Sequence, residues 1–85
     1  MGEVLVTYKI MPEGVETDLD SLLSKIKEKI NVERVEKEPI AFGLVALKVS
    51  VRVEDAGRAT EEIEKFLSEL TEVGSVEVVE MTRLL

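Results

Sequence analysis

The first third of the chain changes its apolar period from two residues to about 3.6. Residues 3–11 alternate as a half-buried strand does, with one face made of Val4, Val6, Tyr8 and Ile10. The segment MPEGVETD then breaks the pattern with a proline and a glycine. A helical stripe follows, which consists of Leu19, Leu22, Leu23, Ile26 and Ile30. Because Thr17 precedes Asp20 by three residues, as in a capping box, we expect Thr17 to cap this helix.

The rest of the chain has the pattern of a strand, a strand, a helix and a strand. Residues 32–38 are charged, alternate weakly and end at Pro39, a combination typical of an edge strand. Residues 44–53 form a longer strand, whose core face would be Val45, Leu47, Val49, Val51 and Val53. A second helix is expected over residues 58–71, with its apolar stripe at Ile63, Phe66, Leu67 and Leu70. Gly74 then leads into a last strand over residues 76–82.

The resulting order, β-α-β-β-α-β, is the split βαβ arrangement of ferredoxin-like folds. We therefore predict an α+β sandwich in which two helices cover one face of a four-stranded antiparallel sheet. The other face would be open and half exposed along the third strand, at Ala46, Lys48, Ser50 and Arg52. Because this fold hosts many unrelated functions, it does not by itself decide the function.

Length and composition narrow the class of protein. The 85 residues indicate one domain. The chain has neither a run of about 18 apolar residues nor a signal-peptide pattern, so we expect no membrane span and a cytoplasmic setting. The absence of Cys and His removes disulfides, imidazole bases and most transition-metal sites. A net charge of −7 repels phosphate backbones, so nucleic acid is not an expected partner.

Enzymatic chemistry has no clear support in the sequence. The serines have no histidine to activate them, and the loop MPEGVETD offers no basic residue to a phosphate. The predicted open face lacks the aromatic residues on which RNA bases stack. Three functions remain: recognition of a protein, binding of a small regulatory ligand between two paired domains, and a purely structural interaction role.

One of the three aromatic residues stands where the chain should turn. In the stretch EPIAFGLVALKVSV, Phe42 lies between Pro39 and Gly43 rather than within a strand. Its ring could fold back as a lid over the end of the core. Alternatively, it could project as an anchor for a pocket on a partner, since aromatic residues dominate such contacts.

This stretch, extended to EPIAFGLVALKVSVRVED, resembles the signature of the nucleotide-exchange domain of translation elongation factor 1-beta. The opening MGEVLVTYKIMPEGVETDLDSLLSKIKEKI and the tail VEVVEMTRLL are similar to those of the archaeal members, which consist of this domain alone. The resemblance therefore covers residues 1–85 as a single guanine nucleotide exchange domain. It implies the same ferredoxin-like fold that the hydrophobic pattern predicts.

The resemblance also implies a function and a partner. Members bind the GDP form of elongation factor 1-alpha, through its GTPase domain and second domain, and accelerate GDP release so that GTP can enter. They make and break no covalent bond, and no cofactor or metal ion of their own is implied. We expect the free chain to be monomeric.

Two sets of site residues follow from the resemblance. An aromatic residue in the PIAFG loop enters an apolar pocket of the partner's second domain, which implies Phe42 with Ile40, Ala41 and Gly43. A basic residue near the C-terminus reaches the partner's magnesium site, which implies Arg83, with Thr82, Leu84 and Leu85 beside it. The residues alone leave other roles open: Arg83 could pair with a surface acid of its own chain, and the two leucines could close the core.

Overall fold

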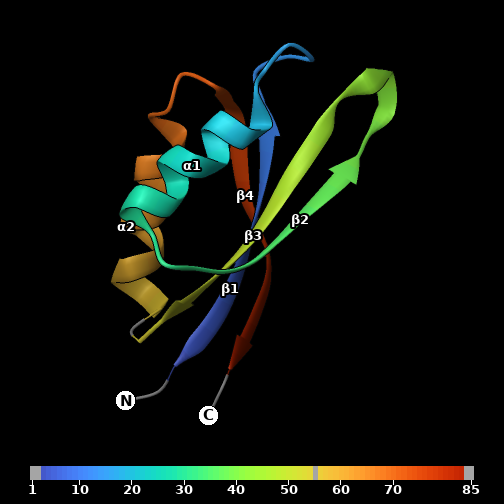
Figure 1. Ribbon diagram of the computed structural model, residues 1–85. Coiled ribbons are helices and arrows are strands. Elements are labelled where there is room, and N and C mark those ends of the chain that lie inside the picture. The colour runs from blue at the N-terminus through green and yellow to red at the C-terminus, as the bar shows by residue number, and fades with distance from the viewer. Residues whose placement is uncertain (1–2, 55, 84–85) are drawn as a thin grey trace.

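The elements follow one another in the predicted order, with a short 3-10 turn added between the second and third strands. The computed structural model describes residues 3–54 and 56–83 (Figure 1). The elements are β1 (Val4–Pro12), α1 (Leu19–Lys29), β2 (Val32–Pro39), η1 (Ala41–Gly43), β3 (Val45–Val53), α2 (Ala56–Ser68) and β4 (Val73–Arg83).

The sheet has the strand order β2-β3-β1-β4, and every neighbouring pair is antiparallel. Both helices lie on the same side of this sheet (Figure 1). The predicted α+β ferredoxin-like fold is therefore confirmed, as is the position of β2 at an edge. That position tolerates Pro39, which cannot donate a backbone hydrogen bond to a neighbouring strand.

The structure corrects the predicted start of α1. The N-cap is Asp18, whose Oδ1 accepts hydrogen bonds from the backbone N–H groups of Asp20 at 3.1 Å and Ser21 at 3.2 Å. The Thr17 hydroxyl instead accepts a hydrogen bond from the Gly14 N–H at 3.3 Å. Thr17 therefore stabilises the preceding loop, and the carboxylate of Asp18 satisfies the free donors at the helix terminus.

The ends of the last two elements also differ from the prediction. Helix α2 runs from Ala56 to Ser68 rather than over residues 58–71, and β4 begins at Val73 rather than at residue 76. The early start of β4 depends on Gly74, because a Cβ there would lie 3.0 Å from the carbonyl oxygen of Pro12. The glycine thus permits close contact with β1 and belongs to the strand itself.

The core lies between the sheet and the two helices. Its fully buried side chains come from β1, β3, α1 and α2, and the largest are Tyr8, Ile10, Leu22, Ile26, Leu47 and Leu67. The Tyr8 hydroxyl donates a hydrogen bond of 3.4 Å to the backbone carbonyl of Thr60 on α2. The one polar group of this large side chain is therefore satisfied inside the core, as buried polar groups require.

The face of the sheet opposite the helices is less exposed than predicted. Ala46 is fully buried and Ser50 is only 5% exposed, although no helix covers them. The hydroxyls of Thr7 and Ser50 are 2.9 Å apart and share a hydrogen bond across β1 and β3. Ala46 and Ser50 on β3 are thus buried without a helix above them, whereas Lys48 and Arg52 remain partly exposed as expected.

Burial raises the pKa of Tyr8 to about 12, and the nearby Glu64 carboxylate adds to the increase. The neutral phenol therefore stabilises the folded state below pH 10, the ordinary pKa of tyrosine, and this contribution is lost as pH rises through about 12. Tyr8 is the only tyrosine and the chain has no tryptophan, so phenolate absorbance reports it alone. We expect the absorbance to rise near pH 12 in the native protein and near pH 10 in denaturant. Equal midpoints in the two solvents, with native circular dichroism retained, would contradict the burial of this group.

Candidate functional site

The tip of the β2–β3 hairpin is closed by two backbone hydrogen bonds. The Ile40 N–H donates to the Leu44 carbonyl at 2.7 Å, and the Leu44 N–H donates to the Ala41 carbonyl at 3.4 Å. Ile40 is half-buried, whereas Ala41, Phe42 and Gly43 are exposed. The sequence PIAFG thus forms a tight, self-bonded turn that presents its central residues to solvent.

Phe42 has a left-handed backbone conformation, with φ 64° and ψ 26°, and Gly43 follows with φ 79°. Among the described residues, Phe42 is the only non-glycine residue with positive φ. This conformation costs about 1–2 kcal/mol for a residue with a Cβ. The ring is 94% exposed, so burial in the core does not offset that cost. The interpretation of Phe42 as a lid over the core is therefore wrong.

The second predicted site lies at the end of β4. Thr82 pairs with Leu5 and Arg83 pairs with Val4 at the start of β1, and both Thr82 and Arg83 are exposed. Within residues 3–54 and 56–83, no carboxylate lies within 4.0 Å of the Arg83 guanidinium. The ion pair considered for Arg83 is thus not formed with this part of the chain. Leu84 and Leu85 lie outside the described residues.

The two predicted sites lie at opposite ends of the sheet. On β1, Val4 pairs with Arg83 whereas Ile10 pairs with Leu47, which follows the hairpin tip along β3. These two positions are about 20 Å apart at about 3.3 Å per residue, and Phe42 lies farther out still. Figure 1 shows the hairpin tip and the C-terminal end at opposite ends of the molecule. Only a large partner could contact both sites at once.

The open face of the sheet carries charges that are paired within the chain. Lys48 lies 3.5 Å from Glu38, and Arg52 lies 3.7 Å from Glu3 and 3.5 Å from Glu33. A shallow hollow of about 240 Å³ crosses this face, and its lining includes Thr7, Arg34, Glu36, Lys48 and Ser50.

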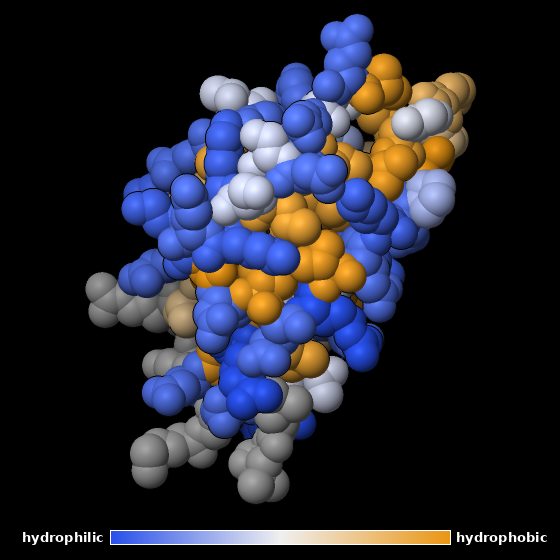
Figure 2. Space-filling view, in the orientation of Figure 1, coloured by the Kyte–Doolittle hydropathy of each residue, from blue (hydrophilic) through white to orange (hydrophobic). Residues whose placement is uncertain are grey.

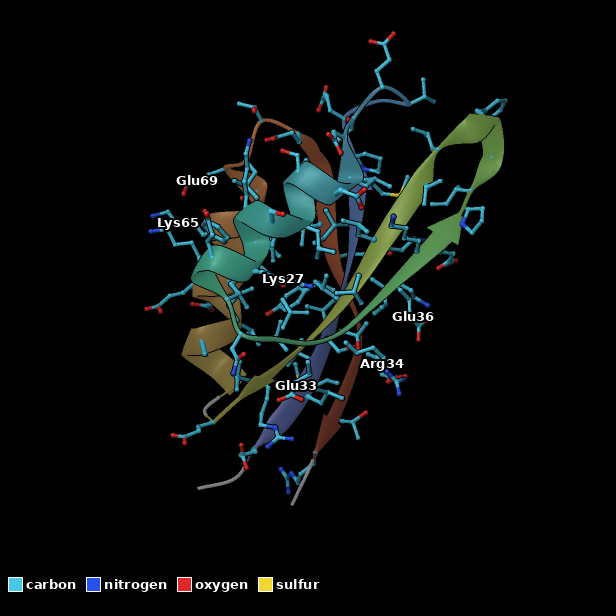
Figure 3. All side chains as sticks on the ribbon, viewed as in Figure 1. Lys27, Glu33, Arg34, Glu36, Lys65 and Glu69 are labelled. Carbon is cyan, nitrogen blue, oxygen red and sulfur yellow. The ribbon has the colours of Figure 1, made fainter. Side chains whose placement is uncertain are left out.

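Figure 3 shows Arg34 and Glu36 extending from β2, and these two side chains are also paired, at 3.8 Å. Because Arg34, Lys48 and the two hydroxyls already have partners, the hollow offers a small ligand few free groups.

Neither a membrane-spanning helix nor a metal-binding cluster is present in the part of the chain that the structure describes. No helix in this part is long and apolar enough to cross a bilayer. Within the same residues, no group of three or more Asp or Glu side chains is arranged to hold a metal ion.

The fold and the surface side chains define a class of protein. It is a ferredoxin-like α+β domain in which the candidate binding residues, Phe42 and Arg83, are exposed on the surface. The ACT domain of GTP pyrophosphokinase from Chlorobium tepidum has the same fold, with a TM-score of 0.71 for its solution NMR structure and 0.66 for its crystal structure. The NMR structure is 15% identical in sequence and aligns with 94% of this chain and 90% of that domain, so the likeness concerns the fold alone.

The family model of the EF-1 guanine nucleotide exchange domain matches residues 5–84, and the chain belongs to this family. It is 44% identical to elongation factor 1-beta of Methanothermobacter thermautotrophicus over the full length of both chains. It is 46% identical to elongation factor 1-beta of Methanococcoides burtonii over 98% of each chain. The resemblance seen in the sequence is confirmed, and the chain is a member of a family of translation elongation factors with guanine nucleotide exchange activity.

Two features of the hairpin end were not predicted. The sequence indicated that Gly43 would allow the turn, but the left-handed conformation extends to Phe42 itself. Val15, in the loop between β1 and α1, is 64% exposed and lies at the same end of the molecule. The sequence signal for Val15 is a single apolar residue within an acidic loop, and this pattern by itself predicts only a break between elements.

Substitution of Gly43 by alanine should measure the free-energy cost of the positive φ at the hairpin tip, separately from any change in packing. A Cβ at Gly43 would meet only Val15 Cγ1, at an ordinary 3.8 Å, so any cost comes from the positive φ. We expect Gly43→Ala to lower the free energy of unfolding by about 1 kcal/mol.

The matched control is Gly14→Ala, where a Cβ meets nothing within 4 Å and φ is not in the left-handed region. This change should be neutral or slightly stabilising. Urea unfolding would measure the free energy of unfolding of both variants. Equal values for the two variants would show that the backbone conformation at Gly43 imposes no cost on a residue with a Cβ.

Proposed function

We propose that the chain promotes exchange of GDP for GTP on elongation factor 1-alpha, by binding its GTPase domain and second domain and disturbing the Mg²⁺ site. The observation that carries this proposal is the Phe42 ring, which is 94% exposed on a left-handed backbone in a chain of the exchange-domain family. Residues in strained backbone conformations cluster at functional sites.

Phe42 would supply the anchor of the complex. Full burial of such a side chain contributes about 1.5–3 kcal/mol, and the closed turn limits the conformational entropy lost on binding. The hydrogen bonds between Ile40, Ala41 and Leu44 hold the turn before any partner arrives. The exposed ring would therefore insert into an apolar pocket of the partner's second domain without rearrangement of the hairpin.

Arg83 would act on the nucleotide site. A GTPase holds GDP through a Mg²⁺ ion that neutralises the diphosphate, so a cation that displaces the metal weakens nucleotide binding. The Arg83 guanidinium is exposed, and no carboxylate in the described part of the chain pairs with it. It is also permanently charged. The coupling is reciprocal, so returning nucleotide and magnesium would weaken the complex by the same factor.

The separation of the two sites supports a partner with two domains. Phe42 and Arg83 lie more than about 20 Å apart along the strands, as the register of β1 shows. One end of the sheet could therefore bind the second domain while the other reaches the GTPase domain. Since the sheet between them is held by β-ladder hydrogen bonds, the domain would fix the relative position of the two contacts.

Truncation of either side chain should reduce exchange and leave the fold intact. We expect Phe42→Ala and Arg83→Ala each to lower the acceleration of fluorescent GDP release from the cognate GTPase at least tenfold. Because both residues are exposed, their unfolding free energies should change by less than about 0.5 kcal/mol. The control is Lys29→Ala, which removes an exposed cation at the end of α1. If the unaltered chain gave no acceleration at micromolar concentration, the proposed function would be wrong.

Excess magnesium should oppose the action of Arg83. If the guanidinium competes with the metal, raising the free Mg²⁺ concentration should reduce the acceleration by the unaltered chain. The same titration should have little effect on the residual activity of Arg83→Ala, since that variant no longer competes. The measurement is the GDP release rate against Mg²⁺ at constant ionic strength. An identical magnesium dependence in both proteins would exclude this mechanism for Arg83.

A further inference from the structure

Two exposed apolar side chains from different loops lie at the hairpin end of the molecule. Among the described residues, five large apolar side chains are exposed, and three of them, Val78, Val79 and Met81, lie on β4. The other two are Phe42 at the hairpin tip and Val15 in the loop between β1 and α1. Figure 2 shows hydrophobic atoms gathered at this end of the molecule.

The two loops lie close together. A Cβ built on Gly43 would lie 3.8 Å from Val15 Cγ1, so Val15 stands beside the residue that follows Phe42. The valine loop is itself held in place. The Thr17 N–H donates to the Gly14 carbonyl at 3.2 Å, and the Glu13 N–H donates to the Glu72 carbonyl at 2.8 Å. Val15 is therefore presented on a fixed turn, as Phe42 is.

The charges around Val15 are of one sign. Glu13, Glu16 and Asp18 are exposed in the same loop, and residues 13–18 contain no Lys or Arg. Within the described residues, no cation lies within 4.0 Å of Glu13 or Glu16. A second copy of this chain would bring like charges together at this surface. A partner with Lys or Arg around an apolar pocket would instead be attracted to it.

We infer that Val15 is a second apolar contact for the partner that receives Phe42, and that the pocket it enters is bordered by basic side chains. The inference rests on the proposed function, because it extends the same docking surface. It assigns the acidic β1–α1 loop a role in binding. The proposed effect on the nucleotide site still depends on Arg83 at the other end of the sheet.

The first test separates affinity from maximal rate. We expect Val15→Ala to raise the concentration of the chain needed for half-maximal acceleration of GDP release by roughly three- to tenfold. The maximal acceleration should stay unchanged, because Arg83 is unaffected. The matched control is Val79→Ala, which truncates an exposed valine on β4 and should leave the half-maximal concentration unchanged. A Val15→Ala curve that superimposes on that of the unaltered chain would overturn the inference.

Val15 could also act only by positioning the hairpin tip, and a double-mutant cycle separates these roles. If Val15 contacts the partner, Val15→Ala should still weaken binding in a Phe42→Ala background. An effect that disappears in that background would show a positioning role and overturn direct contact. If Phe42→Ala left the half-maximal concentration unchanged, Phe42 would not be the binding anchor and the proposed function would be contradicted. If only Val15→Ala changed nothing, the proposed function would stand and this inference alone would fail.

The charge of the partner's pocket is tested by association kinetics. Replacing Glu13 and Glu16 together by Gln should slow association with the GTPase and reduce its dependence on salt. The control replaces Glu28 and Glu69 by Gln, which removes the same charge from exposed positions on α1 and after α2. Equal effects of the two pairs would indicate a response to net charge only, and would overturn the assignment of a basic border.

Discussion

The burial of the helix-facing side of β1 and β3 is the interaction on which the rest of the structure depends. Val6, Tyr8 and Ile10 on β1, with Leu47 and Val49 on β3, are fully buried beneath the two helices. Because strand side chains alternate, slipping either strand by one residue would move these groups to the opposite face. The buried residues therefore fix the register, and the register in turn places the hairpin tip and the end of β4.

This rigid sheet explains how a small domain can present two distant groups. The β2–β3 hairpin extends beyond the helices and carries Phe42, while β4 pairs with the first residues of β1 and carries Arg83 (Figure 1). Neither side chain contributes to the core, so both are available for a partner without loss of stability. This arrangement is the one that the proposed contact with two regions of one GTPase requires.

The surface charges divide into two groups with different consequences. Those on the open face are largely paired within the chain, as Arg52 is with Glu3 and Glu33. The carboxylates of Glu13 and Glu16 lack such partners among the described residues. Surface pairs contribute little to stability, so the difference matters mainly for binding. An unpaired acidic loop beside an exposed aromatic ring favours a partner with basic groups.

The sequence by itself determined the type and order of the elements and the core face of each strand, because those depend on local periods of apolar residues. It also indicated Phe42 and Arg83, through motifs in the loop and the tail, although their roles remain proposals. Only the tertiary structure decided the left-handed backbone of Phe42, the burial of Ser50 and the position of Val15 near Gly43. The burial of Ser50 and the position of Val15 arise where segments far apart in the chain meet, whereas the backbone of Phe42 depends on how the hairpin turn closes. A local pattern of apolar residues carries no information on this register, packing and turn geometry.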